Sequence, residues 1–152
     1  MQLSAANEKK LDYLGNQHLN DFIKKAVEIC EPDKITILTD QKEDLDYVRN
    51  LALQNKEEIS LDYKKHSCHF DGYDDQARDK ENTKYLLEDE NCLDQNMNFR
   101  EREKGLESIY SVLKGSMQGK EMLVKFYTLG PAASTFSIPA VQITDSAYVL
   151  HS

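Results

Sequence analysis

The sequence predicts an α/β domain with a mixed sheet and flanking helices. In the first half, apolar residues at helical spacing alternate with short runs rich in β-branched residues. In the second half, a helical pattern is followed by two strand-like runs. The 152 residues suffice for one domain with a core. We therefore treat residues 1–152 as one unit, and justify its elements in chain order.

An amphipathic helix of about four turns opens the pattern and ends before Pro32, where a proline is a natural stop. Its apolar residues recur at helical spacing: Leu14, Leu19, Phe22, Ile23, Ala26, Val27 and Cys30. The β-branched run 35–39 then predicts a buried strand. The first half thus begins with a helix and a strand.

A second helix and strand follow. Asp40 and Glu43 resemble a capping box at the start of this helix. The helix is expected to turn four residues inward: Leu45, Val48, Leu51 and Ala52. Alternating apolar residues over 59–63 predict the strand: Ile59, Leu61 and Tyr63.

After residue 86 an acidic stretch without an apolar pattern runs to about residue 99. A helix resumes near Arg100 and ends at Gly115, a favoured residue for a helix C-terminus. Its predicted inward face consists of Leu106, Ile109, Tyr110 and Leu113. Runs 122–129 and 139–144 predict two strands joined through a Gly-Pro turn.

The last predicted element is a helix whose cap candidates are Thr144, Asp145 and Ser146. The chain stops a few residues into it, so we expect a longer natural protein and exposed apolar surface over 141–150.

Composition excludes several classes of function. The net charge is −8, and residues 74–103 hold ten carboxylates against five cations, so a nucleic-acid partner is not expected. No apolar run is long enough to span a membrane, and the first residues do not resemble a secretory signal. The three cysteines are widely spaced and odd in number, which favours reduced thiols in the cytoplasm: Cys30, Cys68 and Cys92.

The segment 71–83 places Arg78 among turn formers and carboxylates, with no apolar stripe to bury it. One interpretation is a solvated acidic loop with a compensating cation. The other is a loop that presents Arg78 to an anion, because a guanidinium matches a carboxylate with two parallel hydrogen bonds.

Other candidate sites are weaker. His66, Cys68 and His69 suggest a metal site, but their side chains cannot converge on one strand without a sharp bend. The acidic run 88–90 is better explained as a solvated connector than as a cation site. The run 144–146 has no histidine placed as a base, and no glycine-rich nucleotide loop occurs.

Four stretches resemble GTP-dependent phosphoenolpyruvate carboxykinases, in the same order along the chain. Ala77-Arg78 followed by Thr83 is similar to the family's mobile substrate-binding loop, and 141–149 is the most specific stretch. The other two, 30–37 and 115–131, resemble its early helix–strand junction and its long hairpin. The resemblance covers about residues 16–152 and only the N-terminal part of the family, whose members are several times longer.

The resemblance implies that the chain is part of the N-terminal, substrate-binding domain of an enzyme that converts oxaloacetate and GTP to phosphoenolpyruvate, GDP and CO₂ in gluconeogenesis. Arg78 would bind a carboxylate of oxaloacetate or phosphoenolpyruvate. Mn²⁺ or Mg²⁺ and GTP would be held downstream, so no catalytic, cofactor or metal residue is expected in this chain. The full-length protein would be a cytoplasmic monomer.

The sequence also departs from the family. Members often have Arg-Ile-Glu-Ser-Lys-Thr, whereas this chain has Lys80 in place of that glutamate and Glu81 one residue later. The coupling of this segment to lid closure is therefore open. Two other hypotheses remain: a stand-alone interaction or regulatory domain without the chemistry, and part of a pyrophosphate-dependent carboxykinase. The sequence leaves the phosphoryl donor open among GTP, ATP and pyrophosphate.

Overall fold

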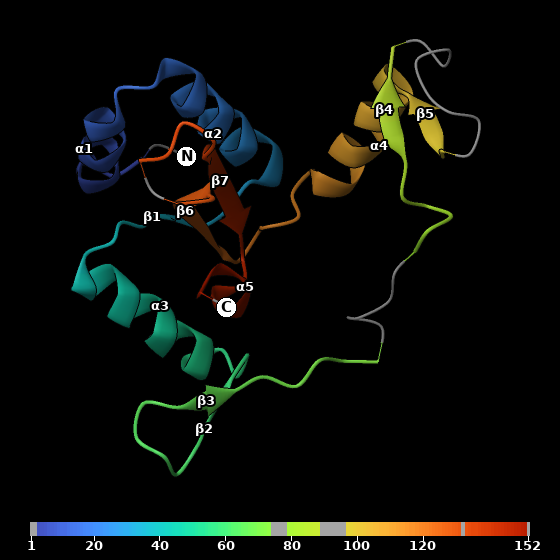
Figure 1. The fold of residues 1–152 in the computed structure, drawn as a ribbon. Helices are drawn as coiled ribbons and strands as arrows, with labels where there is room; N and C mark the ends of the chain where they lie inside the picture. The colour runs from blue at the N-terminus through green and yellow to red at the C-terminus, as the bar shows by residue number, and fades with distance from the viewer. Residues whose placement is uncertain (1–2, 74–78, 89–96, 132, 152) are drawn as a thin grey trace.

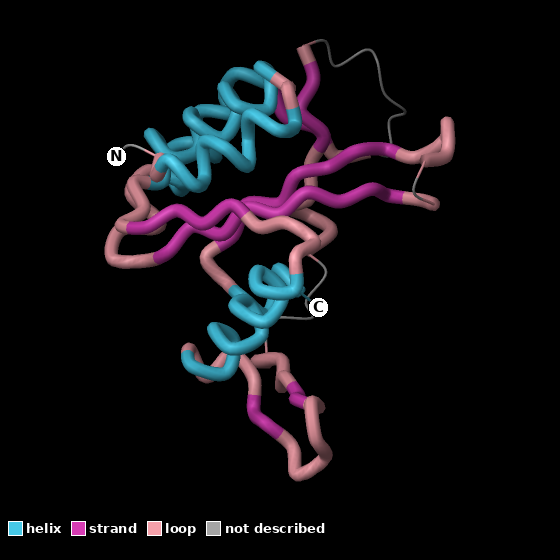
Figure 2. Tube along the Cα trace, turned by 90° about the vertical axis from the view of Figure 1, so that its left-hand side faces the viewer, coloured by secondary structure: helices cyan, strands magenta, loops and turns pink. Residues whose placement is uncertain are grey.

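The computed structural model describes residues 3–73, 79–88, 97–131 and 133–151. Its centre is a three-stranded sheet between two helical layers (Figure 1, Figure 2). The strands, in sheet order, are β1 (Lys34–Ile37), β6 (Glu121–Leu129) and β7 (Ile138–Thr144). One face packs on α1 (Ala5–Leu14) and α2 (Gln17–Cys30), the other on α3 (Lys42–Gln54) and α5 (Ala147–His151).

The sheet is mixed, as predicted. β1 runs parallel to β6, with Ile35 opposite Met122 and Ile37 opposite Val124. β6 and β7 are antiparallel and pair from Leu123 with Thr144 to Leu129 with Ile138. The two strands predicted at 122–129 and 139–144 are confirmed within one residue at each end.

Both faces of the sheet bury apolar side chains, so three consecutive apolar residues occur near the start of β6: Met122, Leu123 and Val124. Ile23, Val27 and Cys30 of α2 are buried against one face, whereas Phe22, also predicted inward, is exposed. The second core cluster lies on the other face and consists of Leu38, Val48, Ala52, Leu123, Ala147 and Leu150. The sheet therefore needs both helical layers.

The first helix, α1, was not predicted, and the expected helix beginning at Leu14 is wrong at its start. Ser4 caps α1 by accepting a hydrogen bond from Asn7 N at 3.3 Å. Gly15 ends the helix with φ 58°, a conformation that favours glycine. Leu14 closes α1, and Asn16 caps the separate helix α2.

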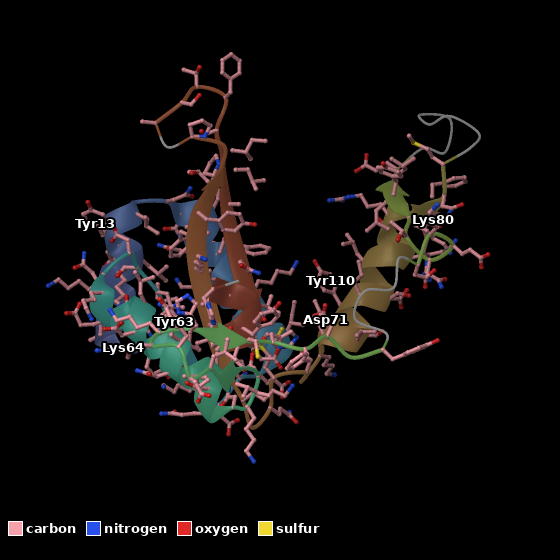
Figure 3. The ribbon with its side chains drawn as sticks, turned by 60° about the horizontal axis from the view of Figure 1, so that its bottom comes forward. Tyr13, Tyr63, Lys64, Asp71, Lys80 and Tyr110 are labelled. Carbon is pink, nitrogen blue, oxygen red and sulfur yellow. The ribbon has the colours of Figure 1, made fainter. Side chains whose placement is uncertain are left out.

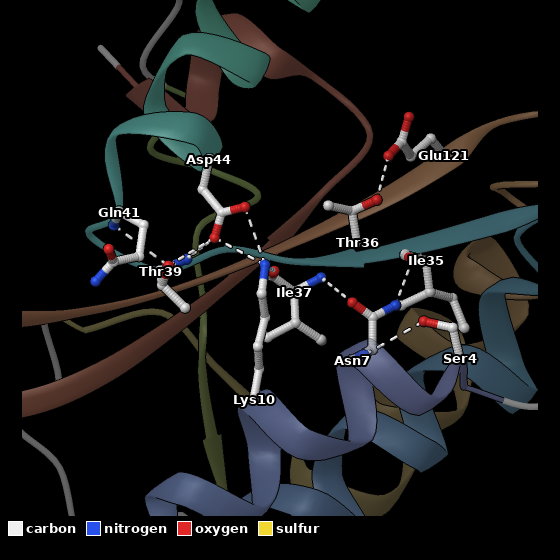
Figure 4. A network of polar contacts seen from close by, with 10 residues as sticks. All are labelled: Ser4, Asn7, Lys10, Ile35, Thr36, Ile37, Thr39, Gln41, Asp44 and Glu121. Carbon is white, nitrogen blue, oxygen red and sulfur yellow. Dashed lines mark hydrogen bonds and ion pairs between the residues drawn. The ribbon is translucent and has the colours of Figure 1, made fainter.

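Asn7 of α1 occupies the free edge of β1. Its amide Nδ2 donates to Ile35 O at 2.7 Å, and its Oδ1 accepts from Ile37 N at 3.0 Å (Figure 4). Lys10, one turn later, donates to Ile37 O at 2.7 Å and pairs with Asp44 at 2.8 Å. The side chains of α1 thus satisfy an edge that another strand would otherwise have to pair.

The predicted capping box at the start of α3 is wrong. Gln41 is the N-cap and makes no side-chain capping bond. Asp44 accepts instead from the backbone N and Oγ1 of Thr39, at 2.8 and 2.6 Å. Burial raises the pKa of Asp44, but the bonds from Lys10 and Thr39 outweigh it and lower that pKa overall. Leu45, predicted inward, is exposed, while Val48 and Ala52 are buried as predicted.

The strand predicted over 59–63 begins at Ile59 as expected but is shorter than predicted. β2 (Ile59–Ser60) and β3 (Ser67–Cys68) form a two-residue antiparallel pair. The three alternating apolar residues of this stretch are exposed: Ile59, Leu61 and Tyr63. An alternating pattern buries one face only where another layer covers it, and this hairpin projects from the body (Figure 2).

An arm stands off the sheet (Figure 1) and consists of β4 (Tyr85–Leu87), β5 (Phe99–Glu101) and α4 (Arg102–Leu113). β4 and β5 pair in parallel, so a strand lies at each end of the acidic stretch 86–99, for which no pattern was predicted. Ile109, Tyr110 and Leu113, on the face predicted inward, are exposed. Gly115, with φ 65°, follows the C-cap Lys114, as expected for a glycine at the end of a helix.

The last helix begins as predicted, because Ser146 Oγ accepts from Val149 N at 3.2 Å. The expectation of exposed apolar surface over 141–150 is largely wrong: Ala147 and Leu150 are buried, and Val149 is exposed. Within the described ranges, no helix has both the length and the apolar composition to cross a membrane.

Candidate functional site

The predicted substrate-binding residue, Arg78, lies outside the described residues, so its position stays a prediction. The residues on either side of it are described. Asp71 lies near the middle of the view in Figure 3, and Lys80 lies in the arm. The chain around Arg78 therefore connects the body of the domain to the arm.

The flank before Arg78 is held by His69. Its ring stacks on that of Tyr148, with centroids 3.7 Å apart and planes at 15°. Its Nδ1 lies 2.6 Å from the backbone oxygen of Glu57, and its Nε2 lies 3.5 Å from Asp71 Oδ1. Since a carbonyl oxygen only accepts, Nδ1 carries a hydrogen and donates a hydrogen bond to Glu57 O.

The Glu57 carboxylate binds the start of α5. Its Oε2 accepts from Ser146 Oγ at 2.5 Å and from Tyr148 N at 2.8 Å, and its Oε1 accepts from Ala147 N at 3.2 Å and Asn55 Nδ2 at 3.0 Å. Burial raises the pKa of Glu57, but these bonds, led by that from Ser146, outweigh it and lower the pKa. The ionised Glu57 carboxylate therefore links the α3–β2 connection to the start of α5 through hydrogen bonds.

A second contact joins the same two segments. Glu58 is only 8% exposed, and its Oε1 lies 2.9 Å from His151 Nε2. The ring of His151 also meets that of Tyr148 edge to face, with centroids 6.4 Å apart. The end of the chain thus packs on the residues that hold His69.

The flank after Arg78 is a compact turn. Asp79 accepts from the backbone N and Nδ2 of Asn82 at 3.0 and 2.6 Å. Thr83 donates two hydrogen bonds to Asp79 O, from its backbone N at 3.0 Å and from its Oγ1 at 2.5 Å. The bonds from Asn82 lower the pKa of Asp79. The oxygen of Lys80 accepts from Asn98 Nδ2 at 2.7 Å, which ties the turn to the arm.

Lys80 and Glu81, where the chain departs from the resembled pattern, are both exposed. Asp79 and Asn82 close the turn through side chain to backbone bonds of the kind common in Asx turns. The local sequence thus accounts for the shape of this flank.

The residues of the metal hypothesis do not gather. His66 Nδ1 contacts Lys64 O at 3.0 Å, while His69 faces Glu57 and Tyr148. Glu88 lies 3.8 Å from Arg102, and residues 89–90 are outside the described part. Among the described residues, no three His, Cys, Asp or Glu side chains are arranged to hold a metal ion.

A hollow of about 600 Å³ lies between α1, α3 and β6. Three of its charged side chains are engaged, Lys10 with Asp44 and Lys125 Nζ with Leu150 O at 2.7 Å, and Asp40 and Arg49 also line it. Much of the remaining lining is apolar, including Leu38, Val48 and Phe126. We assign no ligand to it.

Comparison with known proteins decides the family. Residues 21–152 match the model of the phosphoenolpyruvate carboxykinase N-terminal domain. This range contains all four stretches that resemble the carboxykinases. The chain belongs to this family. The recognition made from the sequence is therefore confirmed, and the α/β architecture agrees with it.

Curated members of the carboxykinase family are similar over nearly the whole chain. Phosphoenolpyruvate carboxykinase (GTP) of Thermococcus sibiricus is 46% identical over 144 residues, and that of Saccharolobus solfataricus is 45% identical over the same length. Each alignment covers 95% of this chain. The protein of the same name from Anaeromyxobacter sp. is 27% identical over 138 residues, or 89% of the chain. In all three, the chain spans 23% of the relative's length.

Sequence reasoning missed the junction of Glu57, His69 and Tyr148. Tyr148 belongs to the stretch that most specifically resembles the carboxykinases, but Glu57 and Tyr148 are 91 positions apart. Glu57 had only one local signal, a carboxylate just after a predicted helix with no charged partner at helical spacing. The sequence around such a carboxylate gives no indication of which distant backbone amides it will bind.

Proposed function

We propose that this chain is the N-terminal, substrate-binding part of a GTP-dependent phosphoenolpyruvate carboxykinase. In the proposed reaction, oxaloacetate loses CO₂ to give the enolate of pyruvate. The enolate oxygen then takes the γ-phosphoryl group of GTP, leaving phosphoenolpyruvate and GDP. The observation that supports this most is the family match over residues 21–152, together with the relatives named phosphoenolpyruvate carboxykinase (GTP).

Within this reaction we assign one residue, Arg78, to the substrate. Its guanidinium would hold a carboxylate of oxaloacetate through two parallel hydrogen bonds. That contact would orient the substrate so that the enolate oxygen faces the phosphoryl donor, a role of positioning and charge stabilisation. What supports the assignment is the resemblance of Ala77-Arg78 and Thr83 to the family's substrate-binding loop.

The divalent metal and the nucleotide are assigned elsewhere. Among the described residues, no three His, Cys, Asp or Glu side chains are arranged to hold Mn²⁺ or Mg²⁺. We propose that both groups are held by the part of the enzyme that corresponds to the remaining length of the relatives. We also propose that the full-length protein is a monomer in the cytoplasm, where the free thiols of Cys30 and Cys68 stay reduced.

The test is Arg78→Ala in the full-length protein that carries this segment. Charge-assisted hydrogen bonds contribute about 1.5–3 kcal/mol each, so kcat/KM for oxaloacetate should fall by roughly tenfold to several hundredfold. Arg78→Lys should recover only part of the loss, because lysine restores charge without the planar geometry. GTP, ATP and pyrophosphate are compared as donors in the same assay.

The matched control is Arg102→Ala, which removes an exposed arginine of α4. Its kcat/KM should stay within about twofold of the parent, since an exposed ion pair contributes little. Loss of folded protein in Arg78→Ala, with normal kinetics in the folded remainder, would show that Arg78 is structural and that the substrate assignment is wrong.

A further inference from the structure

The two outer strands of the central sheet differ at their outer edges. The edge of β1 is closed by α1, because Asn7 and Lys10 bond to the strand backbone (Figure 4). β7 is the outer strand on the other side and pairs only with β6 among the described strands. The residues of β7 are exposed or half-buried, whereas three residues of β6 are fully buried: Met122, Leu123 and Val124. The open edge of the sheet is therefore that of β7.

The direction of the backbone groups of β7 follows from the register of the sheet. Leu38 N donates to Val124 O at 2.8 Å, so the backbone groups of Val124 face β1. Val124 lies opposite Ile143 in the antiparallel pair, so the N–H and C=O of Ile143 face away from β6. Since alternate residues of a strand direct these groups to the same side, the backbone groups of Pro139 and Val141 also face the open edge.

These outward backbone groups have no other partner. Outside the β6–β7 ladder, the hydrogen bonds among the described residues include none to the backbone of Pro139, Val141 or Ile143. Pro139 fits an outward position, because a proline has no N–H to give to a ladder. The open edge thus presents two N–H donors, from Val141 and Ile143, and three C=O acceptors.

The composition of β7 does not protect this edge. Edge strands that stay unpaired are typically very short, carry charged side chains or are covered. β7 is seven residues long and contains no charged residue, and Pro139 blocks pairing only near its start. Ile138 is 61% exposed, and a groove of about 510 Å³ beside the strand is lined by apolar residues that include Leu19, Phe126 and Val141. β7 therefore has the composition of a strand that is paired on both sides.

We propose that the open edge of β7 is an interaction surface that pairs with a β-strand from the part of the full-length enzyme outside these 152 residues. This inference rests on the proposed function, in which the chain is one part of a longer carboxykinase. The relatives have the necessary length, because the chain spans 23% of each. A strand of the same polypeptide reaches an effective concentration of up to the order of millimolar, which favours it over a second copy. Next to Val141, the added strand should place apolar side chains in the groove.

Hydrogen exchange in the full-length protein, resolved to single residues by mass spectrometry, tests the pairing directly. Gln142 N–H faces β6 and should be protected in either case, so it is the internal reference. If a strand covers the edge, the N–H groups of Val141 and Ile143 should exchange on the order of a hundredfold or more slowly than free amides. Exchange of both at the rate of free amides, with Gln142 protected, would refute the inference.

A matched pair of variants of the full-length protein gives a second readout. Val141→Ala and Val141→Pro both shorten or replace the side chain, but only proline removes the outward N–H and obstructs a neighbouring strand. The Tm of Val141→Pro should be lower than that of Val141→Ala by at least about 3 °C, as should that of Gln142→Pro, which removes an N–H facing β6. Equal Tm values for Val141→Pro and Val141→Ala would overturn the pairing. If Val141→Pro does not fold, hydrogen exchange in the parent protein decides.

The source of the strand is read from the oligomeric state. Protected N–H groups of Val141 and Ile143 in a protein that sediments as a monomer support a strand of the same chain. Protection that is lost when a dimer is diluted would show that a second copy covers β7, and would overturn the proposal. None of these measurements uses turnover. A free edge would leave the assignment of Arg78 standing, and normal kinetics in Arg78→Ala would refute that assignment without affecting the pairing of β7.

Discussion

Asn7→Ala should be among the more damaging polar truncations in this domain. Asn7 is 8% exposed, and its side chain pairs with both Ile35 O and Ile37 N on the free edge of β1 (Figure 4). Alanine leaves one buried acceptor and one buried donor without a partner, at a cost of about 1–3 kcal/mol each. Allowing for some access of water, we expect the free energy of unfolding to fall by about 2–4 kcal/mol.

Urea unfolding of the 152-residue chain, followed by circular dichroism, measures this loss as a shift of the midpoint at constant slope. Ser4→Ala is the control, because it removes only the cap of the same helix and should lower the free energy of unfolding by about 1 kcal/mol. Asn7→Asp should destabilise at least as much as Asn7→Ala, since it sets a carboxylate oxygen against Ile35 O. If Asn7→Ala is no more destabilising than Ser4→Ala, Asn7 does not act as the partner of the strand edge.

Two further predictions concern acid stability and activity. Glu57→Gln should lower the free energy of unfolding by about 1–3 kcal/mol at pH 7, because it removes the charge from an acceptor of four hydrogen bonds. Since the folded-state pKa of Glu57 lies below its ordinary value of 4.5, this contribution is complete above pH 4.5 and is lost as the pH falls through the folded pKa. The parent and Glu57→Gln should thus become more similar in their free energy of unfolding only below pH 4.5. Urea unfolding at several pH values measures this. If the two urea midpoints differ by the same amount from about pH 7 to about pH 3, the prediction is wrong. The 152-residue chain alone should show no carboxykinase turnover with GTP, ATP or pyrophosphate, and turnover above that of a heat-inactivated sample would refute this.

Local periodicity predicted the elements that are buried along their length. α2 repeats apolar residues at helical spacing, and β6 opens with Met122, Leu123 and Val124, which are buried from both sides. These patterns arise because an element that faces a core must present apolar side chains with its own geometric period. The family could be recognised for a related reason: short specific runs such as 141–149 are readable without any knowledge of their contacts.

Predictions from local sequence patterns were wrong where an element has no layer packed against it, or where its contacts come from distant residues. The alternation of Ile59, Leu61 and Tyr63 has the period of a half-buried strand, but no layer covers it. α1 was overlooked because it buries only Asn7 and Leu11, and one polar and one apolar residue make no hydrophobic period. Asp40 had the spacing of a helix cap, yet Asp44 makes the bonds at that end of α3.

By itself, the sequence determined the α/β class, the buried helices and strands, the family, and Arg78 as the residue to test. Only the tertiary structure revealed that His69 stacks on Tyr148, and that Glu57 binds the start of a helix some ninety positions later. The physical reason is that periodicity records what a residue does within its own element. A hydrogen bond or a ring stack between distant segments exists only after packing has brought them together, and no spacing along the chain encodes it.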